Sequence, residues 1–281
     1  MGRKRIVITG ATNGIGLAAV EKLAATGALL TIVARDEQKA DATAERLRAA
    51  GGEVDVLLAD LGVQASVRRL ADELLERYPR IDVLVNNAGA MFASRRLSPD
   101  GVELTWALNH LAPFLLTNLL TDLLVASAPA RVVTVSSNAH TRATLDLDDP
   151  QFERRGYAAF TVYGQSKLAN ILFTLELAER LQGRGVTANC LHPGFVRSQF
   201  GMRTNGLLAA GIRVARLFAI TPEQGARTSI YLATSPEVAD VTGRYFVNRR
   251  VATPRPQATD AELARRLWDA SERMTGLVPA T

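Results

Sequence analysis

The sequence predicts an α/β fold with a doubly wound sheet of seven parallel strands and helices on both faces. Short apolar runs rich in Val, Ile and Leu alternate with longer segments whose apolar residues recur at helical spacing. The short runs are continuously apolar, which is typical of parallel strands that are covered on both faces. A glycine-rich turn joins the first run to the first helical segment, as in nucleotide-binding α/β folds.

The elements follow one another as strand, helix, strand, helix. The seven predicted strands are residues 6–8, 29–33, 54–58, 83–85, 132–135, 186–191 and 245–247. The predicted helices include residues 17–23, 40–47, 67–75, 102–124, 168–181 and 226–232. Segments 138–156 and 195–221 break the alternation and are candidate insertions at the substrate site. No repeat, low-complexity stretch or linker divides residues 1–281, so we expect a single domain.

Composition excludes several classes of protein. The 281 residues are 47% hydrophobic and 22% charged, which excludes a disordered, collagen-like or coiled-coil chain. The net charge is +5, but the basic residues are scattered without interleaved aromatic residues, so no nucleic-acid partner is expected. No run of 18 uncharged apolar residues is present, and we expect no membrane span.

Cysteine and histidine usage points to a reducing compartment and away from metal chemistry. The one cysteine, Cys190, cannot form an intramolecular disulfide, and we expect a cytoplasmic protein in which it is a small core residue. His110, His140 and His192 share no metal-ligand spacing, so no metal site is predicted.

The turn after the first strand has the composition of a phosphate-binding loop. It reads Thr9-Gly10-Ala11-Thr12-Asn13-Gly14-Ile15-Gly16, with glycine spacing G-x-x-x-G-x-G. Glycine allows a tight turn and close approach of the backbone to a pyrophosphate, and the N–H groups at a helix start attract negative charge. The predicted cofactor contacts in this loop are Gly10, Thr12, Asn13, Gly14, Ile15 and Gly16. The alternative is an ordinary strand-to-helix turn.

The end of the second strand indicates which dinucleotide binds. Ala34 stands at the strand end, where an acidic residue would bind a free ribose 2′-hydroxyl, and Arg35 follows. An arginine offers paired donors to a 2′-phosphate, so the sequence favours NADP(H) over NAD(H). The alternative is that Arg35 is a solvated residue and that Asp36 is the ribose ligand or a helix N-cap.

Tyr163 and Lys167 form a candidate acid/base pair. They lie four residues apart on a predicted helix, so both side chains can point into one pocket. A phenol titrates near pH 10, and an adjacent cation lowers its pKa toward a useful range.

Polar residues at strand ends supply further candidates. Ser136 and Ser137 end a buried strand, where a hydroxyl can hydrogen-bond a substrate carbonyl or simply satisfy local backbone. Residues 86–89, Asn-Asn-Ala-Gly, end the fourth strand. Asn109 stands among leucines within a predicted helix, where it either bonds backbone or holds a water chain for proton relay.

Together these motifs resemble the short-chain dehydrogenase/reductase superfamily, whose fold is Rossmann-type. Residues 9–16 resemble its cofactor loop, and residues 86–89 resemble its N-N-A-G motif. Asn109, Ser137, Tyr163 and Lys167 resemble its catalytic tetrad. Residues 109–120 and 166–173, with Leu267-Trp268-Asp269, are most similar to the retinol-dehydrogenase-like branch. The resemblance is strong over residues 5 to 200.

The resemblance implies further cofactor contacts and a quaternary state. Asp60 and Leu61 correspond to the pair at the adenine, and Pro193 and Gly194 to the turn beneath the nicotinamide. The implied contacts beyond the glycine loop are Arg35, Asp60, Leu61, Asn87, Ala88, Gly89, Tyr163, Lys167, Pro193, Gly194, Val196 and Ser198. The helices that carry Asn109 and Tyr163 commonly pair in the family, which implies a homodimer or homotetramer.

From two departures we expect no membrane-bound retinoid metabolism. The sequence begins without the membrane helix common in the animal enzymes that it resembles, and Ser198 stands where the family usually has Thr after Pro-Gly.

The mechanism implied by the resemblance is reversible hydride transfer between nicotinamide and a carbonyl carbon. Ser137 would bind the carbonyl oxygen and Tyr163 would donate the proton. Lys167 would bind the nicotinamide ribose and lower the pKa of Tyr163, and Asn109 would position a water that links Lys167 to solvent. Two other classes stay open, a non-redox or epimerising enzyme on this scaffold and a cofactor-binding regulator.

The substrate prediction rests on an apolar segment. Residues 195–221 are rich in Gly, Leu and Ala and are expected to cover a lipophilic ketone or aldehyde, with Phe195, Phe200, Met202 and Leu207 as candidate walls. The alternative for this segment is a packed helix or a subunit contact.

Overall fold

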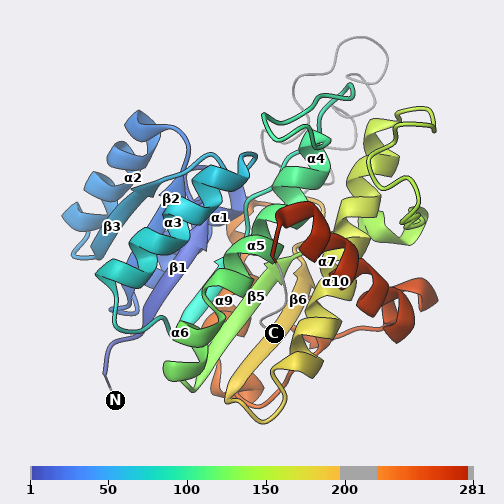
Figure 1. The fold of residues 1–281 in the computed structure, drawn as a ribbon. Coiled ribbons are helices and arrows are strands. Elements are labelled where there is room, and N and C mark those ends of the chain that lie inside the picture. Colours follow the sequence, from blue (N-terminus) through green and yellow to red (C-terminus); the bar gives the residue numbers. More distant parts are fainter. Residues whose placement is uncertain (1, 197–219, 278–281) are drawn as a thin grey trace.

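One eight-stranded sheet forms the centre of the molecule, in the order β3-β2-β1-β4-β5-β6-β7-β8 (Figure 1). The structure is a computed structural model that describes residues 2–196 and 220–277. The strands are β1 (Arg5–Thr9), β2 (Leu29–Ala34), β3 (Glu53–Leu58), β4 (Val83–Asn86), β5 (Ala130–Val135), β6 (Val186–His192), β7 (Arg244–Val247) and β8 (Arg250–Val251). The first seven are mutually parallel, so the doubly wound Rossmann-type fold is confirmed.

The predicted count of seven strands is wrong by one. Asn248 and Arg249 have φ of 50° and 65°, and this two-residue turn reverses the chain after β7. The two residues that follow pair with β7 in the antiparallel direction as β8. A strand of this length leaves no periodic pattern in the sequence, which explains why it was not predicted.

Helices cover both faces of the sheet through two apolar clusters. Ile6 and Ile8 of β1 point to the face covered by α1 (Gly14–Ala24) and α9 (Pro222–Thr234). Val7 points to the opposite face, which is covered by α3 (Gln64–Arg77), α5 (Ala112–Leu119) and α7 (Ala159–Arg180). α2 (Glu37–Ala49) lies beside β2 and β3. Both faces of each central strand are therefore buried, as the continuous apolar runs predict.

The single helix predicted over 102–124 is divided into four pieces. They are α4 (Leu104–Trp106), a π-helical turn (Ala107–Leu111), α5 and α6 (Thr121–Ala126). Pro113 has no N–H group to donate to the carbonyl of Asn109 four residues earlier, which favours a wider turn. In that turn the N–H group of Ala112 donates to the carbonyl of Ala107, five residues back.

A helix outside the predicted set lies near the carboxyl terminus. α10 (Ala261–Thr275) packs against α7 (Figure 1). At their contact Trp268 stacks on Phe173 with ring centroids 5.9 Å apart. Its buried face includes Ala264, Ser271 and Thr275, which are small or polar. Leu267 and Trp268 continue the same face three and four residues after Ala264, which is regular helical spacing, so the sequence does carry an amphipathic pattern here that the predicted helices omit.

The structure describes the first predicted insertion, residues 138–156, in full, but only the two ends of the second, residues 195–221. Residues 143–158 form a loop around buried Asp149, whose carboxylate accepts hydrogen bonds from the backbone of Glu153 and from the backbone and side chain of Arg155. Residues 197–219 of the predicted lid lie outside the described residues. The chain on either side is joined by a bridge between Val196 and Ile220. Among the described helices, none is both long and apolar enough to cross a bilayer.

Candidate active site

The candidate site lies at the carboxyl edge of the sheet, where β1, β4, β5 and β6 end. Parallel strands bring their carboxyl ends to a common edge, and ligands of open α/β sheets bind there. Residues 9–16, 86–89 and 136–137 follow these strands, and the helix α7 carries Tyr163 and Lys167 to the same edge. The fold thus brings together motifs that are up to 158 positions apart, as counted from Thr9 to Lys167.

The glycine loop is built for close backbone approach. Gly10 and Gly14 have φ of 69° and 52°, in the left-handed region that favours glycine. A Cβ atom on Gly16 would lie 2.2 Å from the carbonyl oxygen of Gly10 and 2.5 Å from Nδ2 of Asn87. Asn87 holds the loop because its Nδ2 donates to the carbonyls of Thr9 and Gly10. The loop geometry therefore requires glycine at these positions.

The start of α1 suits an anionic group. Asn13 is the N-cap residue, but its side chain makes no capping hydrogen bond, and no acidic residue occupies the first turn. The N–H groups at this helix start are therefore open to a phosphate. Ile15 packs against Gly225 of α9, where a Cβ atom would lie 3.2 Å from Ile15 Cγ1. These features fit a dinucleotide pyrophosphate.

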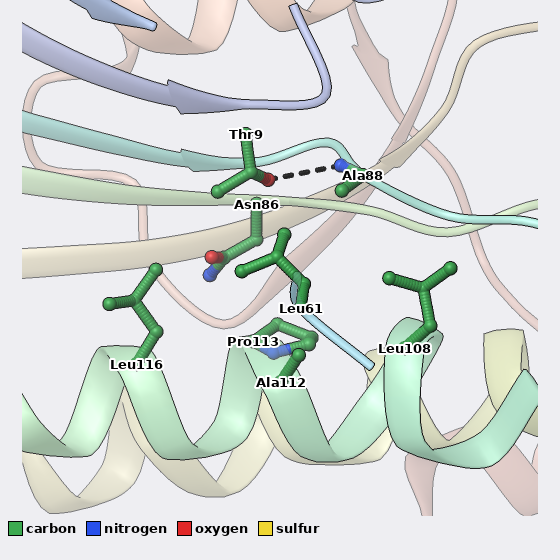
Figure 2. A pocket seen from close by; sticks show the side chains of 8 residues that line it. All are labelled: Thr9, Leu61, Asn86, Ala88, Leu108, Ala112, Pro113 and Leu116. Carbon is green, nitrogen blue, oxygen red and sulfur yellow. Dashed lines mark hydrogen bonds between the residues drawn. The ribbon is translucent and has the colours of Figure 1, made fainter. Parts of the chain in front are cut away.

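A small cavity continues from this loop along the end of β4 (Figure 2). The Oγ1 atom of Thr9 accepts hydrogen bonds from the backbone N–H groups of Asn87 and Ala88, which ties β1 to the 86–89 turn. The side chain of Asn86 points toward the helix below it and donates to Thr117. The residues that line the cavity are Thr9, Leu61, Asn86, Ala88, Leu108, Ala112, Pro113 and Leu116.

The residues after β2 have separate roles. Asp36 is the N-cap of α2, where its side chain accepts from the N–H group of Lys39 and from Lys39 Nζ at 2.7 Å. These bonds lower the pKa of the Asp36 carboxyl. Arg35 is 78% exposed, and its guanidinium lies 4.0 Å from Asp60. Of the alternatives for Asp36, the structure places it as a helix cap, with Arg35 projecting into solvent.

Two serines follow β5 and bond to different partners. Ser136 is buried, and its hydroxyl donates to the carbonyl of Lys167 at 2.6 Å, which fastens α7 to the strand. The Oγ atom of Ser137 accepts from the N–H group of Ala139 at 3.2 Å. Ser137 also hydrogen-bonds Tyr163, an interaction that lowers the pKa of the phenol. Ser137 and Tyr163 are therefore neighbours, as the sequence analysis expects.

Tyr163 and Lys167 share one face of α7. The Lys167 Nζ atom lies 5.7 Å from the centroid of the Tyr163 ring and donates to the carbonyl of Val135 at 2.9 Å. Burial is the largest influence on both groups: it raises the pKa of Tyr163 to about 12 and lowers the pKa of Lys167 to about 8. In this structure the net shift of the Tyr163 pKa is upward, opposite to the lowering expected from an adjacent cation.

Asn109 joins three elements of the site. It is buried in the π-helical turn, and its Oδ1 accepts from the N–H group of Ala90 at 2.8 Å. Its Nδ2 donates to the carbonyl of Ala90 and to Ser166, which in turn donates to the carbonyl of Tyr163. Of the two alternatives for Asn109, the structure shows bonding to backbone and to Ser166. A water relay through Asn109 stays a prediction.

Gly89 lies close to both Asn109 and Lys167. A Cβ atom there would be 3.1 Å from Oδ1 of Asn109 and 3.3 Å from Nζ of Lys167.

Pro193 and Gly194 follow β6, and Gly194 has φ of 95°. Phe195 is 57% exposed. The predicted residues Ser198, Phe200, Met202 and Leu207 lie outside the described residues.

Two supporting residues were missed by sequence reasoning as site residues. Thr9 and Ser166 hold the 86–89 turn and the Tyr163 backbone in place through hydroxyl groups. Each hydroxyl lies within or beside a recognised motif, but its partner is far away in the chain or on backbone. No spacing rule identifies such partners.

The histidines are engaged separately. His110 bonds Ser271, His140 bonds the carbonyl of Ser137, and Nδ1 of His192 accepts from the N–H group of Asn138. Across residues 2–196 and 220–277, no cluster of three or more His, Cys, Asp or Glu side chains is placed to hold a metal ion.

Comparison with known proteins decides the family. A model of the family described as short chain dehydrogenase matches residues 4–206. The chain belongs to this family. Human retinol dehydrogenase 13 is 41% identical to this short chain dehydrogenase, and the match covers 98% of this chain and 85% of the relative. Human retinol dehydrogenase 14 is 43% identical, and the match covers 98% of this chain and 87% of the relative. The expected place in the retinol-dehydrogenase-like branch is confirmed.

Solved structures agree with this assignment. The Pseudomonas aeruginosa RhlG/NADP active-site complex is 32% identical, with a TM-score of 0.70, and covers 86% of this short chain dehydrogenase and 93% of that chain. A protein from Mycobacterium paratuberculosis described as putative and uncharacterized is 34% identical, with a TM-score of 0.79. That match covers 98% of this short chain dehydrogenase and 94% of the mycobacterial chain. This chain is thus an oxidoreductase of a family that uses nicotinamide cofactors.

Proposed function

We propose that this enzyme is an NADP(H)-dependent oxidoreductase that interconverts a lipophilic ketone or aldehyde and the corresponding alcohol. The observation that carries the proposal is the convergence of Ser137, Tyr163 and Lys167 beside the glycine loop. A hydroxyl, a protonated phenol and an ammonium group at one sheet edge can stabilise and protonate an oxygen on which negative charge develops.

The nicotinamide, when bound, supplies or accepts the hydride. In the reductive direction the hydroxyl of Ser137 donates a hydrogen bond to the substrate oxygen. Tyr163 gives its proton to that oxygen, and its pKa of about 12 keeps the phenol protonated at neutral pH. Lys167 holds a positive charge on the same helix face, which favours the phenolate left after transfer. In the oxidative direction the same groups act in reverse.

The preference for NADP(H) is proposed from the residues after β2. Asp36 is already bound to Lys39 as a helix cap, and it is therefore a poor ligand for a ribose hydroxyl. Arg35 is exposed at the end of β2 and can offer paired N–H donors to a 2′-phosphate. NADP in the RhlG complex supports the same preference.

The substrate class is proposed from the relatives and from apolar residues near the site. The names of the human relatives describe dehydrogenases of retinol, an apolar alcohol. Phe195 directly follows Gly194 in the chain, and its side chain is about half exposed. Phe200, Met202 and Leu207 are proposed as further walls on the sequence prediction alone. The partner is therefore a small lipophilic molecule.

We also propose cytoplasmic location and a homo-oligomer. The buried free thiol of Cys190 supports a reducing compartment. The resemblance implies pairing through the helices that carry Asn109 and Tyr163, and α10 packs against the second of these, α7. Light scattering of the purified protein gives the oligomeric state directly.

The test is a titration of the purified enzyme with NADPH and NADH, followed by turnover of a panel of lipophilic ketones and aldehydes. We expect NADPH to bind at least about tenfold tighter, which corresponds to about 1.4 kcal/mol. Arg35→Ala should reduce this preference, and Arg46→Ala, an exposed arginine of α2 paired with Glu21, is the control. Equal affinity for both cofactors would overturn the preference. Tight binding without oxidation of NADPH by any carbonyl would favour the non-redox class.

A further inference from the structure

One peptide group at the candidate site is held by two imidazole rings. It joins Ser137 to Asn138, directly after β5, and both of its polar groups form hydrogen bonds with side chains. Nδ1 of His140 lies 2.7 Å from the carbonyl oxygen of Ser137. The N–H group of Asn138 donates to Nδ1 of His192 at 3.1 Å. The proposed chemistry uses neither histidine, although Ser137 is the residue proposed to bind the substrate oxygen.

The bond to His192 stands where the hydrogen-bond ladder of the sheet stops. The N–H group of Ser136 still donates to the carbonyl of Leu191, in the register of β5 and β6. Because the bonds of a parallel ladder recur every two residues, the N–H group of Asn138 would next reach the carbonyl of Pro193. It bonds the side chain of His192 instead, and Pro193 has no N–H group with which to continue the ladder. An imidazole thus replaces a backbone acceptor at the edge where the site lies.

The peptide group determines the tautomer of each ring. A carbonyl oxygen only accepts hydrogen bonds, so Nδ1 of His140 carries a proton. A backbone N–H group only donates, so Nδ1 of His192 is bare and the proton of the neutral ring is on Nε2. A second proton on His192 would occupy Nδ1 and displace the N–H group of Asn138. The two rings therefore have opposite tautomers at the two ends of one peptide group.

Both rings are kept neutral by their surroundings. Burial is the largest influence: it lowers the pKa of His140, and it lowers the pKa of His192 to about 4. The bond to Ser137 opposes the shift in the pKa of His140, the positive charge of Arg255 adds to it, and His140 adds to the lowering in His192. Nε2 of His140 is buried and has no hydrogen-bond partner among the residues that the structure describes, so a second proton there would be unsatisfied.

Ser137 lies between two fixed peptide groups. Before it, Ser136 is bound through its N–H group to Leu191 and through its hydroxyl to the carbonyl of Lys167. After it comes the peptide group held by the histidines. The backbone of Ser137 is extended, with φ of −158° and ψ of 152°. With the peptide groups on both sides fixed, the direction of the Cα–Cβ bond of Ser137 is fixed as well.

We propose that His140 and His192, as neutral rings of opposite tautomer, are positioning residues that together hold the peptide group after Ser137 and so direct its hydroxyl at the substrate oxygen. His192 is the last residue of β6, so it also ties Ser137 to the strand that leads into Pro193 and Gly194. The kinetic part of this proposal rests on the proposed function, whereas the two tautomers do not.

Histidine nitrogen NMR tests the tautomers without substrate or cofactor. The chain has three histidines, so a sample labelled with ¹⁵N-histidine gives three ring systems. His140→Asn and His192→Asn each remove one of them and assign it. At neutral pH we expect the proton on Nδ1 in His140 and on Nε2 in His192. The opposite tautomer in either ring, or a positively charged ring at neutral pH, would overturn the proposal.

Matched variants of each histidine test the link to catalysis. His192→Leu removes the acceptor and should lower kcat about threefold to tenfold, with the KM for the carbonyl changed less than about twofold. His192→Asn carries a carboxamide oxygen on Cγ, where histidine carries Nδ1, and should restore kcat to within about twofold of the wild type. His140→Leu and His140→Asn form the same pair, because the carboxamide N–H of asparagine can donate to the carbonyl of Ser137. Equal losses of kcat in the Leu and Asn variants would contradict the positioning role.

Thr242→Val is the matched control on the same strand. The hydroxyl oxygen of Thr242 accepts from the N–H group of Ala188 on β6 at 3.0 Å, so this variant also removes a side-chain acceptor of a backbone N–H group. Ala188 precedes His192 by four residues and lies away from the carboxyl edge of the sheet. Thr242→Val should leave kcat unchanged, and a loss equal to that of His192→Leu would argue against the proposal. Thermal unfolding of each variant verifies that the fold is kept.

A double variant shows whether His192 acts through Ser137. Once Ser137→Ala has removed the hydroxyl, adding His192→Leu should lower kcat by less than about twofold further. A further loss as large as that of His192→Leu in the wild type would show that the ring does not act through the serine. If the wild-type enzyme turns over no carbonyl, the proposed function fails, while the tautomer measurement still decides whether the two rings hold the peptide group.

Discussion

The Nζ atom of Lys167 donates a hydrogen bond to the carbonyl oxygen of Val135 at 2.9 Å. Val135 is the last residue of β5, and Ser136 next to it donates back to the carbonyl of Lys167. The strand and the helix are thus joined by two bonds of opposite direction. These bonds hold the ammonium group on the helix face of Tyr163, and burial of the group lowers its pKa.

The lowered pKa of Lys167 predicts an alkaline limit on carbonyl reduction. The group is protonated below pH 8 and loses its positive charge as the pH rises through about 8. We therefore expect kcat/KM for the carbonyl to fall above this pH, since the cation that stabilises phenolate is lost. Initial rates from pH 6 to about 10, corrected for NADPH binding and for enzyme stability at each pH, measure the effect. A flat profile over that range would contradict it.

Tyr163→Phe should lower kcat/KM by at least about a hundredfold, because the proton donor is removed. NADPH affinity should fall far less than kcat/KM, because the other cofactor contacts are kept. Tyr157→Phe is a matched control: burial raises the pKa of this second tyrosine to about 12 as well, but its hydroxyl donates to the carbonyl of Phe92, outside the catalytic group. Steady-state kinetics and NADPH titration of both variants make the comparison. A comparable loss of kcat/KM in Tyr163→Phe and Tyr157→Phe would contradict the assignment of Tyr163 as the proton donor.

Gly16→Ala should weaken NADPH binding by at least about tenfold, which is about 1.4 kcal/mol. The added methyl would lie 2.2 Å from the carbonyl of Gly10, so the loop must shift. Gly156→Ala is the control, because a Cβ atom there would meet nothing within 4 Å. Fluorescence titration with NADPH gives both affinities, and circular dichroism verifies the fold. Unchanged affinity in Gly16→Ala would mean that the loop does not hold the pyrophosphate.

Buried histidines predict that stability falls in mild acid. Burial lowers the pKa of His110 to about 3 and that of His192 to about 4, whereas an unfolded histidine titrates near 6.5. Between these values the unfolded chain binds more protons than the folded one, so the free energy of unfolding decreases as the pH falls below 6.5. We expect the Tm to drop by at least about 5 °C from pH 6.5 to 4.5.

The variant His110→Phe should show a smaller acid dependence of Tm than the wild type. Differential scanning calorimetry at several pH values makes the measurement, with Thr275→Val as a control that keeps all three histidines. A Tm that is constant or rises toward pH 4.5 would contradict the prediction.

Much of the fold and of the site could be predicted from local patterns. Seven strands and the main helices follow from the periodicity of apolar residues, and the glycine loop follows from composition and position. β8 could not be predicted in this way because it has two residues, whereas the buried residues of α10 recur at helical spacing and could have been interpreted as a helix. Pairing and packing with distant elements stabilise them.

Sequence alone determined which residue types are available at the sheet edge. Strand period, helix spacing and glycine placement are local properties, so they indicated Ser137, Tyr163, Lys167 and the loop before any contact was known. Tertiary structure decided what those groups touch. The assignment of Asp36 as a cap, the upward pKa shift of Tyr163 and the pair of bonds between Lys167 and the end of β5 all depend on the burial and the hydrogen-bond partners of these groups in the folded chain. Such contacts come from the packing of the whole chain, because desolvation and hydrogen-bond geometry are set by neighbours that no sequence spacing specifies.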